Sequence, residues 1–474
     1  MRSDEFRSEY RLVKVLAVGR HHVRSAVLSK GEKRITPHQW HEWEEEDGDL
    51  TARGAILEQE MGHFFRQWMS GEGLVDFSSS SVCDSIHLYA NSMRRTIDTG
   101  RNFAMGFMPG TDLEVIYNKN VKMGSMDPVF NAVVSKKSNV FKQKVNAEVE
   151  YLCGEDGLQG EANRLEQDAM LLAEVLDINQ SPACMKGDTC SFHFENAMIA
   201  LQPKIMPMIL GGNIYLAAVT ASDLILQYYD MPDEAGYIFG HSITEEQLNA
   251  IGRIKDIWCY LSMGHATVGT DICHRLLEKM KTEIESTAHK FIYLVGHDSN
   301  MAALTGALEM EDYTLSGTPE LKTPLGGKII LEIWQDSNKS KFVAVNYVYQ
   351  SMHQILSLES LDKDHPPMIV PLKFKKLREN HDGLYAMDDF IQLLDSIISA
   401  YDTLDSYHSL DVNLDRKVDM LDAVDIVSAI KGNPFRFFVK EVADMDGDGQ
   451  LTEDDAISLV IEICTKQRNH SRRD

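Results

Sequence analysis

Three short apolar segments of this chain each lead directly into histidine, arginine or aspartate residues. Val13–Val18 precedes Gly19-Arg20-His21-His22-Val23-Arg24, Ile86–Ala90 precedes Asn91-Ser92-Met93-Arg94-Arg95-Thr96, and Phe291–Val295 precedes Gly296-His297-Asp298-Ser299-Asn300. Continuous apolar runs followed by helix-like segments, such as residues 301–310, are typical of strands buried between two layers of helices. The pattern predicts an α/β fold with a mostly parallel sheet.

The polar residues after these segments are expected to lie close together. In open α/β sheets, ligands bind beyond the carboxyl ends of the strands, and all three polar clusters follow such ends. The sequence therefore predicts one site that contains Arg20, His21, Arg24, Arg95 and the pair His297-Asp298.

These residue types fit the handling of a phosphate group. The guanidinium groups of Arg20, Arg24 and Arg95 offer planar sets of donors that suit a tetrahedral oxyanion. Neighbouring positive charge disfavours the imidazolium form of His21, and a neutral imidazole is a nucleophile. Asp298 is a candidate general acid that gives a proton to a departing oxygen.

Each cluster taken alone also has a structural explanation. Arg20-His21 alone is more often a solvated turn, and Arg94-Arg95 a surface pair at a helix start. Gly296-His297-Asp298 alone fits a strand-end turn or half of a metal site. Their shared position after apolar strands favours a common site. His22 is expected only to shape the pocket.

The three clusters resemble those of the histidine acid phosphatases, the second branch of the histidine phosphatase superfamily, and most closely the bacterial glucose-1-phosphatases and phytases. Further segments that resemble this family are 89–92, 124–131, 181–184, 226–229, 295–300, 323–328 and 347–351. They keep their order from Val13 to Leu372. His22 and Ser25-Ala26 depart from the family pattern, which puts the choice of substrate in doubt more than the chemistry.

The resemblance implies a two-step mechanism without a cofactor. His21 would attack phosphorus and form a phosphohistidine, while Asp298 protonates the leaving oxygen; water would then release phosphate. Arg20, Arg24, Arg95 and His297 would bind the phosphoryl oxygens. Sugar phosphates such as glucose 1-phosphate are the expected substrates, with phytate as a further candidate.

The chain is long enough for more than one domain. Almost two hundred residues that are mostly polar and helix-like separate the second and third apolar segments, which predicts an inserted α-helical cap at about residues 121–284. The α/β core then comprises about residues 1–120 and 285–400, and residues 1–400 form one phosphatase domain. From about Tyr401 the character of the sequence changes, which predicts a separate small module at residues 405–466.

This module contains an acidic pattern that occurs twice. Residues at positions 1, 3, 5, 9 and 12 of a twelve-residue loop supply the oxygen ligands that Ca²⁺ requires. The first copy offers Asp411, Asn413, Asp415, Asp419 and Asp422, and the second Asp444, Asp446, Asp448, Thr452 and Asp455. Position 6 is Gly449 in the second copy but Arg416 in the first, so we expect the first site to be weaker. A solvated acidic helix cap is the alternative.

The two loops resemble those of a type I dockerin, because position 12 is Asp and a helix-like segment follows each loop. Paired EF-hands are the competing interpretation, but they need a helix before each loop and usually Glu at position 12. The resemblance implies an all-α module that binds structural Ca²⁺ and a cohesin on a scaffold protein. Met420-Leu421 and Glu453-Asp454 would contact that partner.

Charge and composition exclude several other functions. Asp and Glu number 72 against 47 Lys and Arg, giving a net charge of −25, which argues against sequence-independent binding to nucleic acid. No stretch approaches the roughly 18 uncharged apolar residues of a membrane-spanning helix. We see no signal-peptide pattern at the start. Cys184 and Cys190, close together in a polar segment, are placed like a small extracellular disulfide.

The sequence therefore predicts a phosphomonoesterase that is extracellular or at the cell surface and attached to a scaffold. A periplasmic or cytoplasmic location is the alternative. Two other functions stay open. One is phosphoryl transfer between sugar positions, as in mutases of the same superfamily. The other is a phosphate-binding module in which His21 is inert.

Overall fold

The computed structural model describes residues 3–232, 236–408 and 410–470 of the chain. Residues 1–2 and 233–235, within the predicted domain 1–400, lie outside the described residues. So does Ser409, within the predicted module 405–466. The boundaries proposed above for the domains stay predictions.

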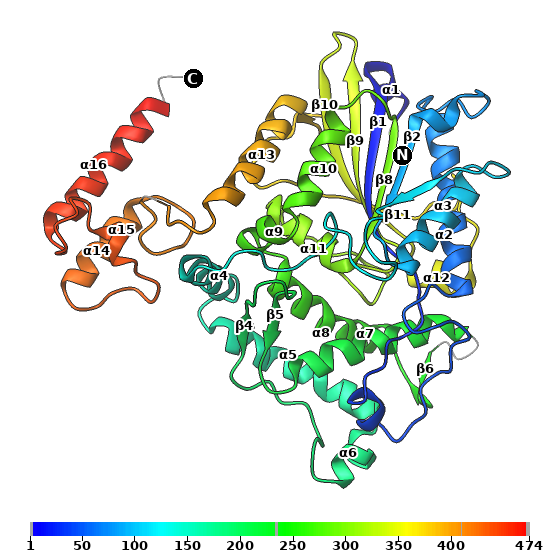
Figure 1. Cartoon of the computed structure of the whole chain (residues 1–474), viewed down its shortest axis with the longest axis horizontal. Coiled ribbons are helices and arrows are strands. Elements are labelled where there is room, and N and C mark those ends of the chain that lie inside the picture. Colours follow the sequence, from blue (N-terminus) through cyan, green and yellow to red (C-terminus); the bar gives the residue numbers. More distant parts are fainter. Residues whose placement is uncertain (1–2, 233–235, 409, 471–474) are drawn as a thin grey trace.

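A mixed sheet forms the middle of the upper half of the molecule in Figure 1. Its strands are β1 (Tyr10–Arg20), β2 (Ile86–Ala90), β3 (Val115–Tyr117), β8 (Phe291–Gly296), β9 (Lys328–Asp336), β10 (Lys341–Tyr349), β11 (Met368–Pro371) and β12 (Tyr385–Ala386). Their order is β11-β10-β9-β1-β8-β2-β3, and β12 pairs with β10. The three apolar segments of the sequence are thus the neighbouring strands β1, β8 and β2.

The prediction of a mostly parallel sheet is wrong. The pairs β1/β8, β8/β2 and β2/β3 are parallel, whereas β1/β9, β9/β10, β10/β11 and β10/β12 are antiparallel. The pair β9/β10 is antiparallel because these strands follow each other across a short turn, and such a hairpin needs no crossover helix. The half that carries the three polar clusters is parallel, as predicted.

Alternate residues of β1 enter two different cores. Val15 and Ala17 pack on one face of the sheet, and Leu16 and Val18 on the other. This alternation is the period of two that a strand imposes on its side chains. Helices α2 (Ala52–Gly71) and α3 (Arg94–Phe107) cover the first face; α9 (Ala266–Ile272), α10 (His274–Glu285), α11 (Asp298–Ala307) and α13 (Met387–Ala400) lie over the second.

A second layer, mostly helical, is inserted in the chain between β3 and β8 and occupies the lower half of Figure 1. It contains α4 (Asn139–Leu152), α5 (Gly157–Val175), α6 (Pro182–Met185), α7 (Ile214–Asp230) and α8 (Glu245–Met263), with the short strand pairs β4 (Met198–Ala200) and β5 (Met208–Leu210), and β6 (Tyr237–Ile238) and β7 (His241–Ser242). Helix α8 begins at a capping box, in which Thr244 and Gln247 each bond the other's backbone N–H.

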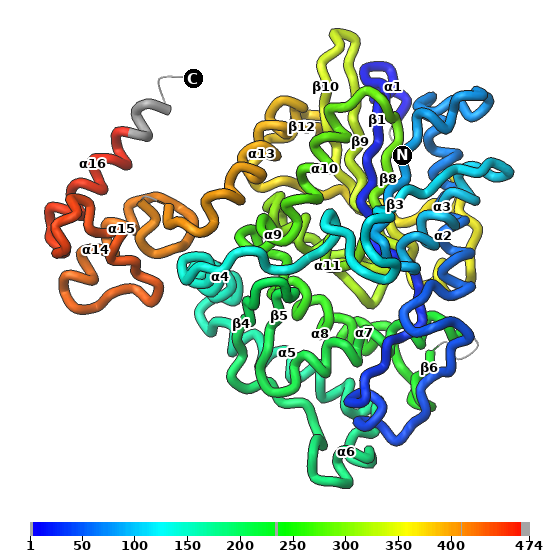
Figure 2. The backbone as a smooth tube through the Cα atoms, in the orientation of Figure 1, coloured from blue at the N-terminus to red at the C-terminus, as the bar shows by residue number. Residues whose placement is uncertain are grey.

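The C-terminal part extends from α13 to one side of the molecule, where Figure 2 shows it in orange and red. It contains α14 (Met420–Ile430), α15 (Lys440–Ala443) and α16 (Glu453–His470). Helices α14 and α16 pack on each other around Ala423, Ile426, Leu459 and Ile463. Two further short helices are α1 (Asp4–Glu9) and α12 (Met352–Ser357).

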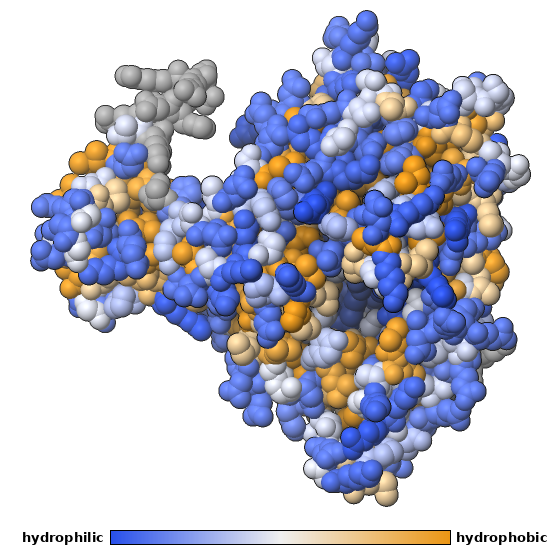
Figure 3. Space-filling model, in the orientation of Figure 1, coloured by the Kyte–Doolittle hydropathy of each residue, from blue (hydrophilic) through white to orange (hydrophobic). Residues whose placement is uncertain are grey.

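Among the described residues, no helix combines the length and the apolar character needed to cross a membrane. Figure 3 shows a hollow near the centre of the visible face, between the strands of the upper half and helices α7 and α8 below.

Candidate functional site

The parallel register of β1 and β8 brings two of the polar clusters together. Arg20 lies opposite Gly296, the last residue of β8, so His21 and His297 follow at neighbouring strand ends. Their ring centroids are 5.5 Å apart. Arg95 joins them from the first turn of α3, and Asp298 begins α11. The structure therefore places Arg20, His21, Arg95, His297 and Asp298 in one cluster.

His21 is held in the orientation that a nucleophile needs. It is 3% exposed, and its Nδ1 lies 2.9 Å from the carbonyl oxygen of His22, to which Nδ1–H donates. Burial and the positive charges of Arg95 and Arg20 lower the pKa of His21 well below its usual value. The ring is thus neutral, and its Nε2 keeps a free lone pair.

Arg20 is buried and Arg95 is half-buried, and both cations have a covered donor that is unused. Arg20 is 2% exposed, and its Nη1 donates to Glu320 at 2.7 Å. Burial and the nearby Arg24 lower the pKa of Arg95 to about 10. The Nε–H groups of both residues have no hydrogen-bond partner within the described part of the chain. Because buried donors are rarely left unpaired, these groups are suited to receive an anion.

Arg24 has two partners of its own near the other two arginines. Its Nη2 lies 3.6 Å from Oδ1 of Asp223 on α7, and Nη1 donates to the carbonyl oxygen of Ser25. Its positive charge still contributes to lowering the pKa values of His21 and His297. The three arginines together make the site cationic, although the chain as a whole is strongly acidic.

His297 presents an N–H toward the site formed by His21 and the arginines. The side-chain oxygen of Asn91 accepts bonds from the backbone of Ser92 and Asp127, both at 2.8 Å, so its amide nitrogen faces His297. This nitrogen donates to Nε2 of His297 at 2.6 Å. The proton of the neutral ring is therefore on Nδ1, and since a guanidinium group can only donate, the 3.4 Å contact of Nδ1 with Nη2 of Arg95 brings two donors together. Nδ1–H is placed to donate to an anion held by that arginine.

Asp298 is surrounded by cations. Its Oδ2 lies 3.4 Å from Nη2 of Arg20 and 3.2 Å from Nζ of Lys255, while Oδ1 accepts from the backbone of Ser299. Burial alone would raise its pKa, but Lys255 and Arg20 outweigh burial and lower the pKa well below its usual value. Asp298 is therefore ionised in the free site.

Lys255 and Glu320 were not found from the sequence. Both are buried, and Lys255 Nζ lies 3.1 Å from Oε1 of Glu320 and 2.9 Å from the hydroxyl of Thr323. Burial and Arg20 act to lower the pKa of Lys255, but Glu320 and Asp298 raise it above its usual value, so it stays charged. The sequence did contain a sign that Lys255 is buried, because it lies on the same apolar helix face as Ile251 and Trp258.

His22 belongs to the wall of the site. It is fully buried; its Nδ1 accepts from the backbone of Val23 and its Nε2 lies 3.0 Å from Oε1 of Gln350. Burial and the charge of Lys328 lower its pKa to about 3. A Cβ on Gly326, which has a φ of +67°, would come within 2.2 Å of the ring. Both ring nitrogens thus have hydrogen-bond partners, and the ring packs closely against Gly326. This agrees with the expectation that His22 only shapes the pocket.

The second acidic loop forms a compact set of carboxylates. Ligand atoms of Asp444, Asp446 and Asp455 lie within 4.8 Å of one another. Asp444 accepts from the backbone of Gly447 and Gly449, both at 2.8 Å, which turns the loop around it. Thr452 donates to Asp455, and Asp448 accepts from the backbone of Gln450. This donor set of hard oxygens fits Ca²⁺.

The first acidic loop makes similar backbone hydrogen bonds, but its position 6 is Arg416 where the second loop has Gly449. Asp422 accepts from the backbone of Val412 and Asp419, as Asp455 accepts from that of Met445 and Thr452. Asp415, Asn413 and Asp419 each accept from a backbone N–H two residues further on. Position 6 is left-handed in both loops, with a φ of +84° at Gly449 and +68° at Arg416.

A buried carboxyl in the first loop also lacks a partner. Oδ1 of Asp411 has no hydrogen bond within the described residues, and the residue is 4% exposed. Burial and the neighbouring Asp422 and Asp415 raise the pKa of Asp411 to about 6. A cation that binds these carboxylates would offset their repulsion, so the first loop also fits Ca²⁺.

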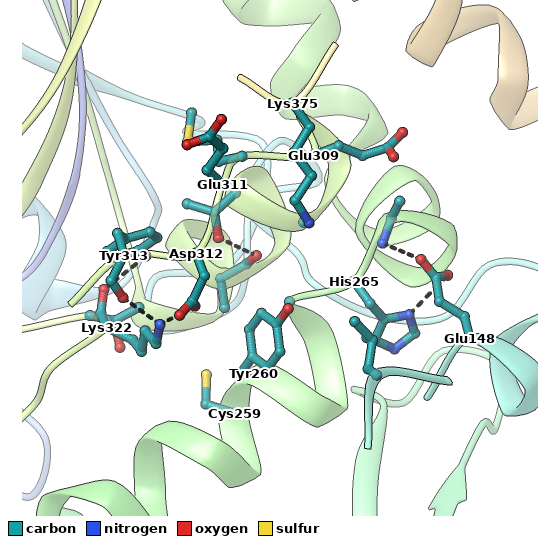
Figure 4. Close-up of a pocket in the computed structure, with 18 of the residues that line it drawn as sticks. Glu148, Cys259, Tyr260, His265, Glu309, Glu311, Asp312, Tyr313, Lys322 and Lys375 are labelled. Atoms are coloured by element: carbon teal, nitrogen blue, oxygen red, sulfur yellow. Dashed lines mark hydrogen bonds and ion pairs between the residues drawn. The ribbon is translucent and has the colours of Figure 1, made fainter. Parts of the chain in front are cut away.

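Arg416 connects this loop to the rest of the protein. Its Nη1 lies 2.7 Å from Glu148 on α4, and its Nη2 2.8 Å from Glu309 just after α11. Burial alone would raise the pKa of Glu148, but His265 and Arg416 lower it. Figure 4 shows the pocket that these residues line, with Glu148 bonded to His265. Tyr151 further donates to the carbonyl oxygen of Asn413.

The structure also pairs Cys184 with Cys190 in a disulfide, in a loop of the helical layer. The pair lies away from the strand ends that carry the site. It closes a short loop around the end of α6.

Comparisons with known proteins agree with this geometry. The model of a family described as the histidine phosphatase superfamily (branch 2) matches residues 11–163 and 263–350. A glucose-1-phosphatase of Providencia rettgeri is 31% identical over 403 residues, covering 83% of this chain and 94% of that protein. One of Salmonella typhimurium is 29% identical over 82% of this chain and 92% of its own length.

Solved structures give the same result for the fold. The phytase of Hafnia alvei, in complex with myo-inositol hexakis sulphate, aligns with a TM-score of 0.72 at 25% identity. The alignment covers 82% of this chain and 97% of the phytase. The phytase of Citrobacter braakii, at 24% identity, has a TM-score of 0.74 over the same share of this chain and 98% of its own.

Proposed function

Because the chain belongs to branch 2 of the histidine phosphatase superfamily, we propose that it hydrolyses phosphomonoesters through a phosphohistidine at His21. One observation carries this proposal. Nδ1 of His21 is occupied by a backbone carbonyl, so that Nε2 is left as the nucleophilic nitrogen within a group of cationic side chains. A solvated turn or a surface pair would not hold a neutral, buried imidazole among arginines.

The first step transfers the phosphoryl group to the enzyme. Arg20, Arg24 and Arg95 bind the phosphoryl oxygens, and Nδ1–H of His297 donates a further bond. Nε2 of His21 attacks phosphorus with its lone pair and forms a P–N bond, while the ester P–O bond breaks. The electron pair of that bond goes to the leaving oxygen, which takes a proton from Asp298.

The second step releases phosphate. A water molecule gives a proton to the Asp298 carboxylate and attacks phosphorus, and the P–N bond breaks so that its electron pair returns to His21. The arginines stabilise the charge on the phosphoryl oxygens in both steps.

The low pKa of Asp298 sets a condition on the first step, because a general acid has to carry a proton. A bound phosphate dianion brings negative charge next to Arg20 and so offsets part of the field that keeps Asp298 ionised. Substrate binding therefore raises the pKa of Asp298. An acidic medium also increases the protonated fraction of Asp298, which fits an acid phosphatase.

Sugar monophosphates such as glucose 1-phosphate are the substrates we propose first. Two relatives at 29% and 31% identity are named glucose-1-phosphatases, whereas the relative named a phytase, from Escherichia coli, is 27% identical. The net charge of −25 offers no long-range attraction for a polyanion such as phytate, so phytate is the second candidate.

Phosphate release from a panel of substrates tests the function. The wild type should release phosphate from an aryl phosphate and from glucose 1-phosphate, and His21→Ala should release none. A phosphate-binding module would release phosphate from neither. A mutase would convert glucose 1-phosphate into another sugar phosphate without accumulation of free phosphate. Cleavage of phytate without cleavage of any sugar phosphate would reverse our order of substrates.

We also propose that residues 405–466 form a type I dockerin that binds structural Ca²⁺ and a cohesin on a scaffold protein. The two loops would hold the ions through Asp411, Asn413, Asp415, Asp419 and Asp422, and through Asp444, Asp446, Asp448, Thr452 and Asp455. Three features support this: the repeated spacing, a left-handed residue at position 6 of each loop, and the packing of α14 against α16.

The same proposal gives a cohesin-binding surface and a location. Met420, Leu421 and Ile457 are exposed hydrophobic residues at or near the starts of α14 and α16, close to the residues expected to contact the partner. A cohesin that is captured in the presence of Ca²⁺ and released by a chelator would support the dockerin. The attachment, together with the disulfide Cys184–Cys190, supports an extracellular or cell-surface location.

A further inference from the structure

Two histidines and one aspartate meet on the helical layer, away from the catalytic cluster. Nε2 of His38 lies 2.7 Å from Oδ2 of Asp177, and Nε2 of His241 lies 2.9 Å from the same oxygen. The candidate ligand atoms of the three residues all lie within 4.8 Å of one another. Neither the phosphatase chemistry nor the acidic loops use any of these side chains.

The three residues come from segments that are far apart in the sequence. His38 lies in the loop that leads from β1 to α2, Asp177 follows the end of α5, and His241 begins β7. Figures 1 and 2 show the loop, in dark blue, beside β6 in the lower right of the view. Only the tertiary fold brings these ligands together, so no local motif of the sequence reveals them.

Packing holds His38 in place independently of Asp177. The ring of His38 stacks on Phe239 with a centroid distance of 5.0 Å and an interplanar angle of 9°. Phe239 in turn contacts the buried ring of Trp40 edge to face. The imidazole of His38 is therefore oriented by aromatic neighbours, which is the kind of support that a preorganised metal ligand needs.

The donor set selects a class of metal ion. Two imidazole nitrogens and one carboxylate oxygen suit Zn²⁺ and related transition metals, whereas Ca²⁺ and Mg²⁺ prefer oxygen ligands alone. Ligand atoms around a tetrahedral zinc lie roughly 3.3–3.5 Å apart, given bonds of about 2.0–2.2 Å. The present contacts would therefore open by roughly half an ångström to admit the ion.

Solvent can complete such a site. The side chains of His38, Asp177 and His241 are 30%, 24% and 41% exposed. An ion can thus enter from water, and a water molecule can take the fourth position of a tetrahedron. We propose that His38, Asp177 and His241 bind Zn²⁺ or a related divalent transition metal, and that this ion ties the loop after β1 to the end of α5 and to the β6–β7 hairpin.

Calorimetric titration of the full-length, untagged protein with ZnCl₂ tests the proposal. Excess Ca²⁺ is present so that the acidic loops are saturated. The wild type should bind one Zn²⁺ at this site, and His38→Ala and His241→Ala should each weaken that binding by more than about tenfold, since even the loss of an outer-shell partner costs about 10–100-fold. Circular dichroism checks that both variants are folded.

Two control variants separate this site from other histidines. His381 lies in a second group of candidate ligands with Glu9 and Asp382, and His193 bonds to Glu166 and to the hydroxyl of Ser191. His381→Ala and His193→Ala should keep the wild-type affinity. Loss of Zn²⁺ binding in His381→Ala but not in His38→Ala would overturn the assignment.

A measurement on the wild type avoids any dependence on variants. Co²⁺ bound by two nitrogens, one carboxylate and water in a tetrahedron should give intense visible absorption, which added Zn²⁺ should abolish. Absence of that spectrum together with absence of saturable Zn²⁺ binding would overturn the proposal and leave the three residues as a purely hydrogen-bonded cluster. Phosphatase activity plays no part in either readout, so failure here is separate from failure of the proposed function.

Discussion

Nζ of Lys255 lies 3.2 Å from Oδ2 of Asp298, although Lys255 belongs to the helical layer and Asp298 follows a strand of the sheet. A buried ammonium group thus faces the proposed general acid from the other side of the site. It favours the ionised carboxylate, whereas the first chemical step needs the protonated form.

Replacement of this lysine should move the pH range of activity. Lys255→Met removes a cation that lowers the pKa of Asp298, so that pKa should rise and Asp298 should stay protonated to higher pH. The fall of kcat/KM on the alkaline side, measured with an alkyl phosphate, should shift upward by about one pH unit, equivalent to about 1.4 kcal/mol of lost interaction. Lys255→Arg should restore most of the wild-type profile, and Lys281→Met, a surface control, should leave it unchanged. A profile of Lys255→Met that coincides with that of the wild type would show that Lys255 does not tune the acid.

His21 should carry the phosphoryl group. Rapid mixing with labelled substrate, followed by quenching in alkaline denaturant, should trap label that is stable in base and lost in acid, as for a phosphohistidine. His21→Ala should trap none and should lose turnover by about 10⁴-fold or more, in line with the removal of nucleophiles in other covalent enzymes. His63→Ala, an exposed histidine on α2, serves as the control. Label that persists in His21→Ala would move the nucleophile elsewhere.

Asp298→Asn should affect substrates according to their leaving groups. A departing alkoxide needs a proton, so turnover of an alkyl phosphate should fall by about 10²–10⁴-fold. A nitrophenolate leaves without one, and its release from the phosphate should fall much less. Parallel measurement of kcat for both substrates checks this. Equal losses would instead indicate that Asp298 has a structural role.

The two acidic loops should differ in their affinity for Ca²⁺. Arg416 occupies a left-handed position at which a non-glycine residue costs roughly 1–2 kcal/mol, whereas Gly449 adopts it freely. Asp444→Ala should therefore reduce Ca²⁺ affinity more than Asp411→Ala in calorimetry on the full chain. Phosphate release should not depend on Ca²⁺ in either variant. Greater damage from Asp411→Ala would show that the ion pairs of Arg416 with Glu148 and Glu309 outweigh the backbone cost.

The strands that carry the site could be predicted because their signal is local. Val13–Val18, Ile86–Ala90 and Phe291–Val295 are apolar runs bounded by polar residues, and each one lies in a strand of the central sheet. The partners of those strands are not encoded locally. β9 pairs with β1 in antiparallel fashion and continues into the β9–β10 hairpin, and the prediction of a mostly parallel sheet missed both pairings.

Residues of the site could likewise be predicted only where the signal is local in the sequence. Arg20, His21 and Asp298 could be named because each directly follows an apolar run. Lys255 and Glu320 could not be placed beside them, since they reach Arg20 and Asp298 only through contacts between distant segments. Asn91 was part of a segment that resembles the family, but its bond to His297 depends on the register of β2 and β8.

The contacts that Arg416 makes with Glu148 and Glu309 would affect the orientation of this enzyme beside other enzymes on a scaffold. A catalytic domain on a flexible tether takes up many orientations relative to its scaffold. Residues 405–466, the proposed attachment module, contact the phosphatase domain through these ion pairs and through Tyr151, so binding to a scaffold would give the entrance of the active site a fixed orientation relative to that scaffold. Neighbouring enzymes on the same scaffold would then face this entrance at a constant angle.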